Sequence, residues 1–364
     1  MLSCSLPLAP GPLEATAFCR GRVAEGRALA AMASRAGVAT NDTFGLLSRY
    51  GRDVAGAISL VPTGEEPQRS ASTEPYDDQQ LTQAVANLDD NPLGIEDDSE
   101  LSLAGLQSKL LLVKAGSGWA RPVGGAASTH ILKVDDPRFP GLIEAEHACL
   151  ELAAASGITA AESKLEQVGS QHCLIVTRFD RTHDRDAQRI HQEDTCQALA
   201  VDPSGARGRA KYESAGGPSF AAVAGLLDRF GGDGLAEMER LLGYATFTVI
   251  AGNADAHGKN VSLLHEPLGT TRLAPMYDIV PTVLWQSLRT EPAMRIGSAR
   301  DIREARRSDL LAEAAIWGVP ATRAESVVDG VCERVTTALD GGVIDHQGVA
   351  TQARTATARI MADE

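Results

Sequence analysis

Short apolar runs separated by turns fill the middle of the chain, between residues 109 and 177. Such runs, bounded by Gly, Ser and Asp, are typical of β-strands. The pattern predicts strands at Lys109–Val113, His130–Val134, Lys164–Val168 and Cys173–Thr177. A helix is predicted among them at Leu142–Ala155, because apolar residues recur there at helical spacing and Gly157 follows as a stop signal.

Beyond Asp180 the apolar residues take the spacing of helices. Helices are predicted at Gln192–Leu199, Ser219–Phe230, Asp233–Ile250 and Asp309–Trp317, with further helical segments towards the C-terminus. A β-rich stretch that holds one helix is therefore followed by a helical stretch. This order of elements predicts an α+β fold.

The N-terminal residues form a third region. A helix is predicted around Arg22–Ala36 and a strand at Ile58–Val61. The next segment, Pro62–Asp78, loses its apolar residues and gains Pro, Ser and charge, so it is interpreted as a linker. These changes predict a small N-terminal subdomain at 1–65, a β-rich lobe with its linker at 66–179, and a helical lobe at 180–364.

The charge balance narrows the classes of partner. Acidic residues outnumber basic residues by 48 to 34 over 364 residues, which gives a net charge of −14. This sign argues against nucleic acid or an anionic membrane as the main partner of the surface. No apolar run approaches the roughly 18 residues of a membrane-spanning helix. The start resembles no secretory signal and the cysteines show no C-x-x-C pair, so we expect a cytoplasmic protein with reduced thiols.

The strongest chemical pattern is the loop Gly252–Asn260, which follows a long apolar helix. Asp255 and Asn260 lie five residues apart in this loop, and a predicted hairpin then brings a second carboxylate, Asp278. Phosphoryl transfer from a nucleotide needs a carboxylate that accepts the proton of the attacking hydroxyl, and oxygen ligands that hold Mg²⁺. We therefore predict Asp255 as the base and Asn260 and Asp278 as metal ligands. The alternative is an ordinary turn whose Asp and Asn cap backbone groups.

The β-rich stretch supplies the complementary features. Lys133 lies between apolar residues in a predicted strand, where a charge is costly unless it is paired. The next helix offers Glu146, with Glu144 as the second choice on a different face, and kinases solve the same problem with a strand lysine and a helix glutamate. The alternative is a surface lysine whose ammonium reaches solvent.

Two further segments of this stretch are predicted to contact the nucleotide. The loop Ser102–Lys109, which contains Gly105 and Gln107, is expected to lie over the phosphates, although it lacks the G-x-G-x-x-G pattern. Thr177–Phe179, where the pattern changes from β to α, is expected to meet the base through its backbone.

Seven segments, taken together and in order, resemble the HipA-type serine/threonine protein kinases, the toxins of bacterial toxin–antitoxin modules. They are Ser102–Lys109, His130–Lys133, Arg178–Arg181, Gln192–Asp194, Lys211–Pro218, Asn253–Asn260 and Tyr277–Ile279. The resemblance covers nearly the whole chain from about Leu2. It implies a two-lobed, protein-kinase-like fold with a small N-terminal subdomain, and ATP and Mg²⁺ as cofactors.

The resemblance also implies roles for single residues. Asp255 would be the catalytic base, Asn260 and Asp278 would hold the metal, and Lys133 would contact the nucleotide phosphates. Separately from the resemblance, we predict that His257 and Lys259 of the same loop bind the nucleotide. For His257, a residue that orients Asp255 and a residue that packs the loop are the alternatives. Ser102 would be an autophosphorylation site, and a phosphate there would oppose the ATP phosphates by charge.

Partners follow from the resemblance as well. Members of the family phosphorylate a protein, characteristically an aminoacyl-tRNA synthetase, and assemble with a small helix-turn-helix antitoxin that binds operator DNA, so DNA contact would be indirect. By the resemblance, long family members begin with strands ahead of the segment at Leu2, and we expect this sequence to lack them. A mis-assigned start, a fold that tolerates the loss, and a separate small protein that completes the subdomain are the three explanations left open. Two other functions stay open: a kinase-fold phosphotransferase of a small molecule or lipid, and a catalytically idle co-repressor.

Overall fold

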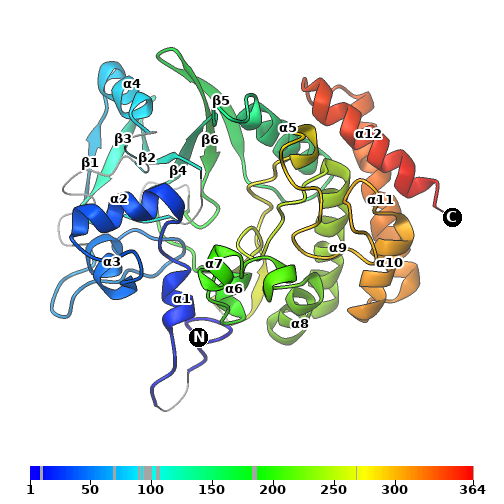
Figure 1. The fold of residues 1–364 in the computed structure, drawn as a ribbon, viewed down its shortest axis with the longest axis horizontal. Helices are drawn as coiled ribbons and strands as arrows, with labels where there is room; N and C mark the ends of the chain where they lie inside the picture. The colour runs from blue at the N-terminus through cyan, green and yellow to red at the C-terminus, as the bar shows by residue number, and fades with distance from the viewer. Residues whose placement is uncertain are drawn as a thin grey trace. The chain divides into compact units, whose positions relative to one another are not determined.

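The computed structural model divides into two compact units, and each is described by itself (Figure 1). The β-rich unit comprises Phe18–Ile143 and Glu162–Gln192, and the helical unit comprises Met1–Ala17, Glu144–Ala161 and Glu193–Glu364. The residues that the structure describes are 1–8, 11–68, 71–88, 91, 93, 101–103, 107–182, 187–267 and 269–363.

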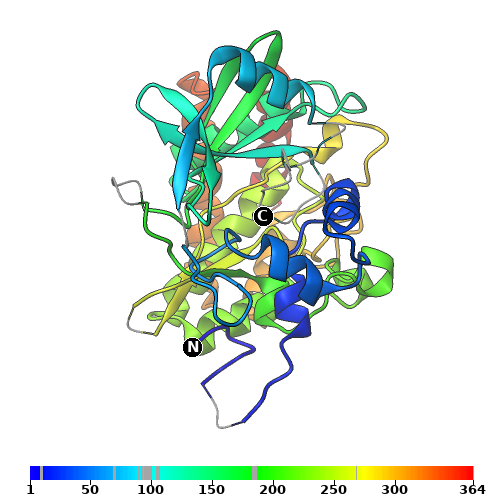
Figure 2. The ribbon, with the colours of Figure 1, turned by 90° about the vertical axis from the view of Figure 1, so that its left-hand side faces the viewer.

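The β-rich unit is built on an antiparallel sheet with the strand order β1-β3-β2-β4-β6-β5 (Figure 2). Its strands are β1 (Ser72–Pro75), β2 (Lys109–Ala115), β3 (Gly118–Val123), β4 (His130–Val134), β5 (Ser163–Val168) and β6 (Gln171–Thr177). Alternate residues such as Leu110, Leu132 and Ile175 point to one face, where they pack with Val85 from helix α4 (Asp78–Ala86). Burial of this apolar face holds α4 and the sheet together.

A second core in the same unit lies among the N-terminal helices. These are α1 (Thr16–Arg20), α2 (Gly26–Ala36) and α3 (Thr43–Tyr50). Met32, Leu46 and Tyr50 are buried there. Helix α3 begins where the side chain of Asp42 accepts the N–H of Gly45 at 2.9 Å, and α2 ends at Gly37, whose φ of 66° is left-handed.

Most predicted strands are confirmed, and two predictions for the N-terminal half are wrong. The predicted linker Pro62–Asp78 contains strand β1, which pairs with β3, and the helix α4 already begins at Asp78. All four residues of β1 are exposed, so no apolar alternation marks the strand. Ile58–Val61 forms no strand. The N–H of Leu60 donates instead to the carbonyl of Gly51 in the same loop.

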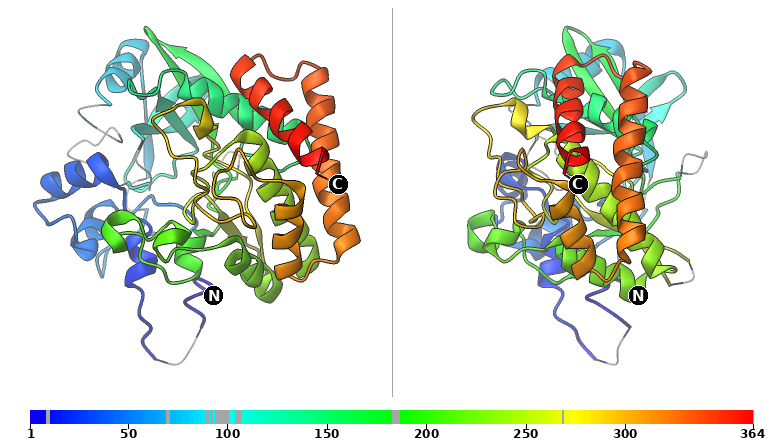
Figure 3. Two further views of the ribbon diagram at one scale, coloured as in Figure 1. Left: turned by 45° about the vertical axis from the view of Figure 1, so that its right-hand side comes forward. Right: turned by 90° about the vertical axis from the view of Figure 1, so that its right-hand side faces the viewer.

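The helical unit is organised around α9 (Gly234–Ala251), which is buried along most of its length and contacts α8, α11 and α12 (Figures 1 and 3). The other elements are α5 (Leu142–Ala155), α6 (Thr195–Ala198), α7 (Gly205–Gly208), α8 (Phe220–Phe230), α10 (Arg307–Ile316), α11 (Ala321–Asp340) and α12 (Gln347–Met361), with 3-10 turns at Glu213–Ala215 and Thr282–Leu284. Figure 3 shows α11 and α12 lying side by side as an antiparallel pair.

A small three-stranded sheet, β7-β8-β9, completes this unit. Its strands are β7 (Gln192–Asp194), β8 (Ser262–His265) and β9 (Thr271–Leu273). The predicted helix Gln192–Leu199 is therefore wrong in its first half. Asp194 ends the strand and caps α6, because its carboxylate accepts the N–H of Gln197 at 2.9 Å while the Gln197 side chain accepts the N–H of Asp194 at 3.1 Å.

All six cysteines lie among the described residues, and none of them forms a disulfide. Among the described residues, no helix is long and apolar enough to cross a membrane.

Candidate functional site

The loop that contains Asp255 starts from a fixed point at the end of α9. Gly252 takes a left-handed φ of 69°, and the N–H of Asn253 donates back to the carbonyl of Thr248 at 3.0 Å. A Cβ at Gly252 would lie 2.4 Å from Cγ2 of Val283, so a larger residue does not fit. The main chain at Gly252 is thus fixed in a single conformation at the end of α9, and this conformation sets the path of the residues that follow.

Asp255 and Asn260 are brought together by hydrogen bonds within the loop. The side-chain nitrogen of Asn260 donates to the main-chain carbonyl of Asp255 at 3.1 Å. The N–H of Asp255 donates to Oδ1 of Asn253 at 3.0 Å, and the N–H of Asn260 donates to the carbonyl of His257 at 2.8 Å. Because the amide nitrogen of Asn260 is used in this way, its side-chain oxygen is the atom suited to a metal.

His257 is a buried residue of this loop rather than a direct partner of the Asp255 carboxylate. Its Nδ1 accepts the N–H of Lys259 at 3.3 Å, and its Nε2 lies 4.0 Å from Oδ2 of Asp255, beyond hydrogen-bonding distance. The ring packs edge-on against the ring of Tyr212, with centroids 5.3 Å apart. These contacts agree with a residue that shapes the loop.

The ammonium of Lys259 is buried in an ion pair. Its Nζ lies 2.9 Å from Oδ2 of Asp194, and both side chains are at most about a tenth exposed. Thr195, the next residue after Asp194, donates its hydroxyl to the carbonyl of Gly258 at 2.6 Å. The segment around Asp194 therefore fixes the loop at Gly258 and Lys259. Removing one partner of a buried ion pair of this kind strongly destabilises the folded protein.

Asp278 lies beyond strand β9 in an unusual backbone conformation. Its φ of 56° is left-handed, which is uncommon outside glycine and costs on the order of 1 kcal/mol. The preceding residue, Tyr277, is anchored to the loop, because its hydroxyl donates to the carbonyl of Lys259 at 2.7 Å and contacts the hydroxyl of Ser262 at 2.7 Å. Strained residues of this kind cluster at functional sites.

The charge of Asp278 acts on the carboxyl group of Asp255. Partial burial raises the pKa of Asp255, and the negative charge of Asp278 adds to this rise. A hydrogen bond from Tyr212 and the charges of Lys211 and Arg289 act in the opposite direction without cancelling the rise. Carboxylate and amide oxygens are the hard donors that Mg²⁺ prefers, so the residue types of Asp255, Asp278 and Asn260 fit this ion, and a divalent cation would relieve the repulsion between the two carboxylates.

The remaining predicted residues lie in other parts of the structure. Lys133 is on β4 and only 6% exposed, opposite Leu174 of β6 in the sheet register. Gln107 donates from Nε2 to the carbonyl of Val134 at 2.9 Å, next to Lys133 in sequence. Glu146 is fully buried on α5, in the helical unit. The pairing of Lys133 with Glu146 stays a prediction, and Gly105 lies outside the described residues.

Ser102 is fully buried within the β-rich unit. Its hydroxyl accepts the N–H of Ala24 at 3.1 Å and donates to the carbonyl of Arg22 at 3.2 Å, while its own N–H donates to the carbonyl of Asp53 at 3.0 Å. In this conformation the hydroxyl is a buried group that is bonded to the main chain.

The segment that holds Thr177 and Phe179 is fixed by a buried ionic network. Arg178 and Asp180 form two hydrogen bonds, at 2.9 and 2.7 Å, and Arg181 lies 2.9 Å from Oδ1 of Asp53. The N–H of Gly56 donates to Asp180 at 2.7 Å. Burial acts to raise the pKa of Asp180, but the adjacent guanidinium groups outweigh it and hold the pKa well below its usual range.

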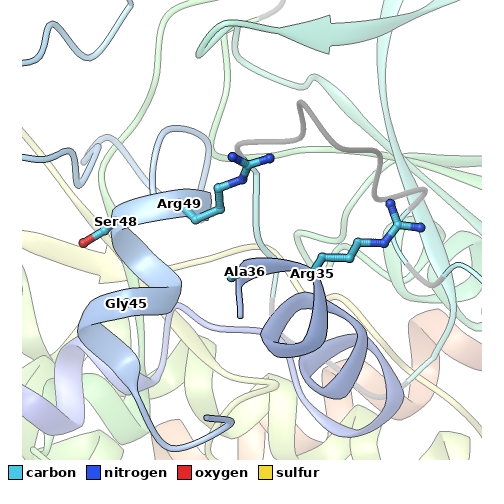
Figure 4. Close-up of a pocket in the computed structure, with 5 residues that line it drawn as sticks. All are labelled: Arg35, Ala36, Gly45, Ser48 and Arg49. Atoms are coloured by element: carbon cyan, nitrogen blue, oxygen red, sulfur yellow. The ribbon is translucent and has the colours of Figure 1, made fainter. Parts of the chain in front are cut away.

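A cavity of about 410 Å³ lies between α2 and α3 in the β-rich unit (Figure 4). It is lined by Arg35, Ala36, Gly45, Ser48 and Arg49, with both arginine side chains reaching out from their helices. None of the predicted site residues lines it.

Sequence reasoning missed three partners of the loop. Asp194 and Tyr212 lie inside two of the segments that carry the family resemblance, but no local pattern shows which residues they contact. Arg289 carries no signal in the sequence. A buried lysine such as Lys259 does require an acidic partner, and that requirement could have directed attention to Asp194.

Comparison with known proteins assigns the chain to a family. Residues 101–339 match the HipA-like C-terminal domain and residues 1–61 match the HipA N-terminal domain. The chain therefore belongs to the HipA family, and its fold is the α+β, protein-kinase-like fold with a β-rich lobe and a helical lobe that the resemblance implied.

Individual relatives agree with this assignment. The protein "Putative kinase Y4mE" of Sinorhizobium fredii is 38% identical over 93% of this chain and 83% of its own length. The "Serine/threonine-protein kinase toxin HipA" of Shewanella oneidensis is 31% identical over 81% of this chain and 71% of its own length. A solved chain from the Shewanella oneidensis complex of HipA, HipB and operator DNA matches with a TM-score of 0.79 and 26% identity, covering 95% of this chain and 84% of that chain.

Proposed function

We propose that this protein is an ATP- and Mg²⁺-dependent serine/threonine protein kinase. The observation that carries the proposal is the loop of Asp255, in which a hydrogen bond fixes Asn260 to the main chain of Asp255, and to which Tyr277, the neighbour of Asp278, is bonded through the carbonyl of Lys259. A base and two oxygen ligands in this relation are what phosphoryl transfer requires.

Each residue then has a defined task. Asp255 accepts the proton of the attacking hydroxyl, and its side chain is 43% exposed, so an acceptor can reach it. The oxygens of Asn260 and Asp278 hold the metal, which when bound neutralises charge on the β- and γ-phosphates. Lys133 contacts the nucleotide phosphates with support from Glu146, and the backbone of Thr177–Phe179 meets the base.

The relatives support a biological role for this activity. One is named a serine/threonine-protein kinase toxin, and a similar solved chain is part of a toxin–antitoxin complex with HipB and operator DNA. By this likeness we propose that the protein is a toxin that binds a DNA-binding antitoxin. Its substrate would be a protein of translation, such as an aminoacyl-tRNA synthetase.

Autophosphorylation at Ser102 is part of the proposal and has a structural consequence. The Ser102 hydroxyl is bonded to the main chain of residues 22 and 24. Before it can accept a phosphoryl group, these bonds must break and the segment must leave its buried place. The place that the hydroxyl now occupies does not suit a phosphate, because its partners there are one main-chain carbonyl and one main-chain N–H, and a doubly charged group would be buried.

Phosphopeptide mass spectrometry after induction tests the proposal, with Asp255→Ala as the matched control. We expect new phosphoserine or phosphothreonine sites on cellular proteins, and on Ser102, with the wild type but not with the variant. Label from ATP that ends in a small-molecule fraction would instead indicate a kinase-fold phosphotransferase. Identical phosphopeptides with both proteins, together with unchanged operator repression, would indicate an idle co-repressor.

A further inference from the structure

Tyr212 lies beside the proposed base because the main chain on both sides of it is bonded to the catalytic region. The carbonyl of Lys211 accepts the N–H of Gly258 at 3.0 Å, within the loop of Asp255. The N–H of Glu213 donates to the carbonyl of Ala293 at 2.9 Å, and the N–H of Ala293 in turn donates to the carbonyl of Ala254 at 2.9 Å. The main chain of residues 211–213 is therefore bonded to the loop of Asp255 twice, directly at Lys211 and by way of Ala293 at Glu213.

Turn geometry strengthens this placement. The N–H groups of Ala215 and Gly217 both donate to the carbonyl of Tyr212 at 2.9 Å. A Cβ at Gly217 would lie 2.5 Å from the carbonyl oxygen of Ala210 and 2.8 Å from the carbonyl carbon of Tyr212, so the turn requires glycine. The segment Lys211–Pro218 is thus folded tightly on itself.

The ring of Tyr212 is also constrained. It meets the ring of His257 edge-on, at an interplanar angle of 89°, and the guanidinium carbon of Arg289 lies 5.2 Å from its centroid. Edge-to-face aromatic contacts and cation–π contacts of this kind are both attractive and depend on the orientation of the ring. The orientation of the ring is consequently set by two neighbours besides the main chain.

The hydroxyl at the end of this ring donates to Oδ1 of Asp255 at 2.8 Å. The second oxygen, Oδ2, lies 4.0 Å from Nε2 of His257, which is too far for a hydrogen bond. One oxygen of the carboxylate is therefore held by Tyr212, and the other is the oxygen that an acceptor hydroxyl can approach.

We propose that Tyr212 is a positioning residue for phosphoryl transfer: its hydroxyl holds Oδ1 of Asp255 and so presents Oδ2 to the hydroxyl of the acceptor. This inference rests on the proposed function, because it assigns Asp255 as the base. It concerns the acceptor side of the reaction and predicts no role for Tyr212 in binding ATP or the metal.

The expected size of the effect follows from the geometry of proton transfer. A misplacement of about 1 Å in a reacting group can reduce a rate by about 100-fold, and a hydrogen bond to a charged group is among the stronger ones. Tyr212→Phe keeps the ring and both of its ring contacts and removes only the hydroxyl. We expect kcat to fall about 10-fold, with KM for ATP unchanged.

The matched control is Tyr50→Phe. The hydroxyl of Tyr50 also donates a hydrogen bond from a buried ring, to the carbonyl of Met32 at 3.2 Å, but it lies in the N-terminal core of the β-rich unit. Tyr50→Phe should leave kcat unchanged. An equal fall in kcat for both variants would refute the inference, because it would indicate a general effect of losing a tyrosine hydroxyl.

A double-mutant cycle with Asp255→Asn decides whether Tyr212 acts through Asp255. If it does, Tyr212→Phe has no further effect on the residual rate of Asp255→Asn, since the oriented carboxylate is already gone. Two effects that multiply would overturn the inference, as would phosphotyrosine found on Tyr212, which would make it an acceptor. Full activity of Asp255→Asn itself would refute the proposed function instead, so the two failures can be told apart.

Discussion

The substitution Asp53→Asn tests whether a buried charge network holds the segment at Arg178–Arg181. Asp53 is 2% exposed. Its Oδ1 lies 2.9 Å from Arg181 and 3.3 Å from Arg189, and its Oδ2 accepts the N–H and the hydroxyl of Ser128 at 3.0 and 2.6 Å. Asparagine has nearly the same shape, so the change removes a charge and directs an amide donor at groups that are donors themselves.

The expected cost is large because the charges left behind are buried. The network would keep one carboxylate, that of Asp180, and lose the charge of Asp53. This remaining carboxylate would lie among three guanidinium groups, those of Arg178, Arg181 and Arg189. Removing one partner from a buried ionic network typically costs about 3–5 kcal/mol. We expect a loss of this size in the free energy of unfolding, measured by urea denaturation followed by fluorescence and circular dichroism.

Asp136→Asn provides the matched control. Asp136 also binds an arginine through both oxygens, at 3.0 and 2.6 Å, but the Arg138 side chain is 77% exposed. Solvent screens such a pair, so its loss should barely move the unfolding midpoint. Equal shifts for the two variants would refute the argument that burial gives the Asp53 network its strength.

The pH dependence of the free energy of unfolding gives a second check, on the wild type and Asp53→Asn. Burial acts to raise the pKa of Asp53, but Arg181, Arg178 and Arg189 outweigh it and leave the pKa below its usual value. A carboxyl with a lowered pKa stabilises the fold above its unfolded pKa of about 3.9, and this contribution is lost as the pH falls through the folded value. The stability difference between wild type and Asp53→Asn should therefore be constant near neutral pH and shrink below about pH 4.

Two further predictions concern the loop. Asn260→Ala and Asp278→Ala should each lower the affinity for ATP at least 10-fold in the presence of Mg²⁺ but not in its absence, as measured by isothermal titration; an equal loss without Mg²⁺ would contradict their assignment as metal ligands. Gly258→Ala should reduce kcat at least 10-fold, because a Cβ there would lie 2.5 Å from Cγ of Pro218 and 2.9 Å from Sγ of Cys196 and would displace the loop. The control Gly225→Ala in α8, where a Cβ meets nothing within 4 Å, should leave kcat unchanged. Similar rates for both variants would contradict the prediction, because the loop would then tolerate displacement.

The elements that local pattern defines well could be predicted from the sequence. Strand β4 and helix α5 have the predicted bounds, because both are apolar stretches with clear turn or stop residues beside them. The loop of Asp255 could be located for a similar reason, since it follows the long apolar helix α9 and carries a carboxylate and an amide at a spacing with a known chemical use. Its hydrogen bond from Asn260 to Asp255 lies within one short stretch of chain.

Contacts between distant parts of the chain could not be predicted in this way. Strand β1 is exposed at every residue, and only its pairing with β3 makes it a strand. Tyr212 reaches Asp255 over 43 positions, and Asp53 reaches Arg181 over 128. Nothing in the residues around Asp53 indicates that its carboxylate is buried, because the three arginines that compensate it come from other elements.

The central claim is that Asp255 is the base of a kinase, and transfer of the γ-phosphoryl group of ATP by the purified protein tests it most directly. With labelled ATP and Mg²⁺ in a single-turnover reaction, the wild type should place label on protein serine or threonine. A general base contributes about 10²–10⁴ to such a rate, so Asp255→Asn should be slower by at least 100-fold while it still binds ATP and Mg²⁺. Transfer by Asp255→Asn within threefold of the wild type, or no transfer by the wild type to any protein of a cell extract, would contradict the account.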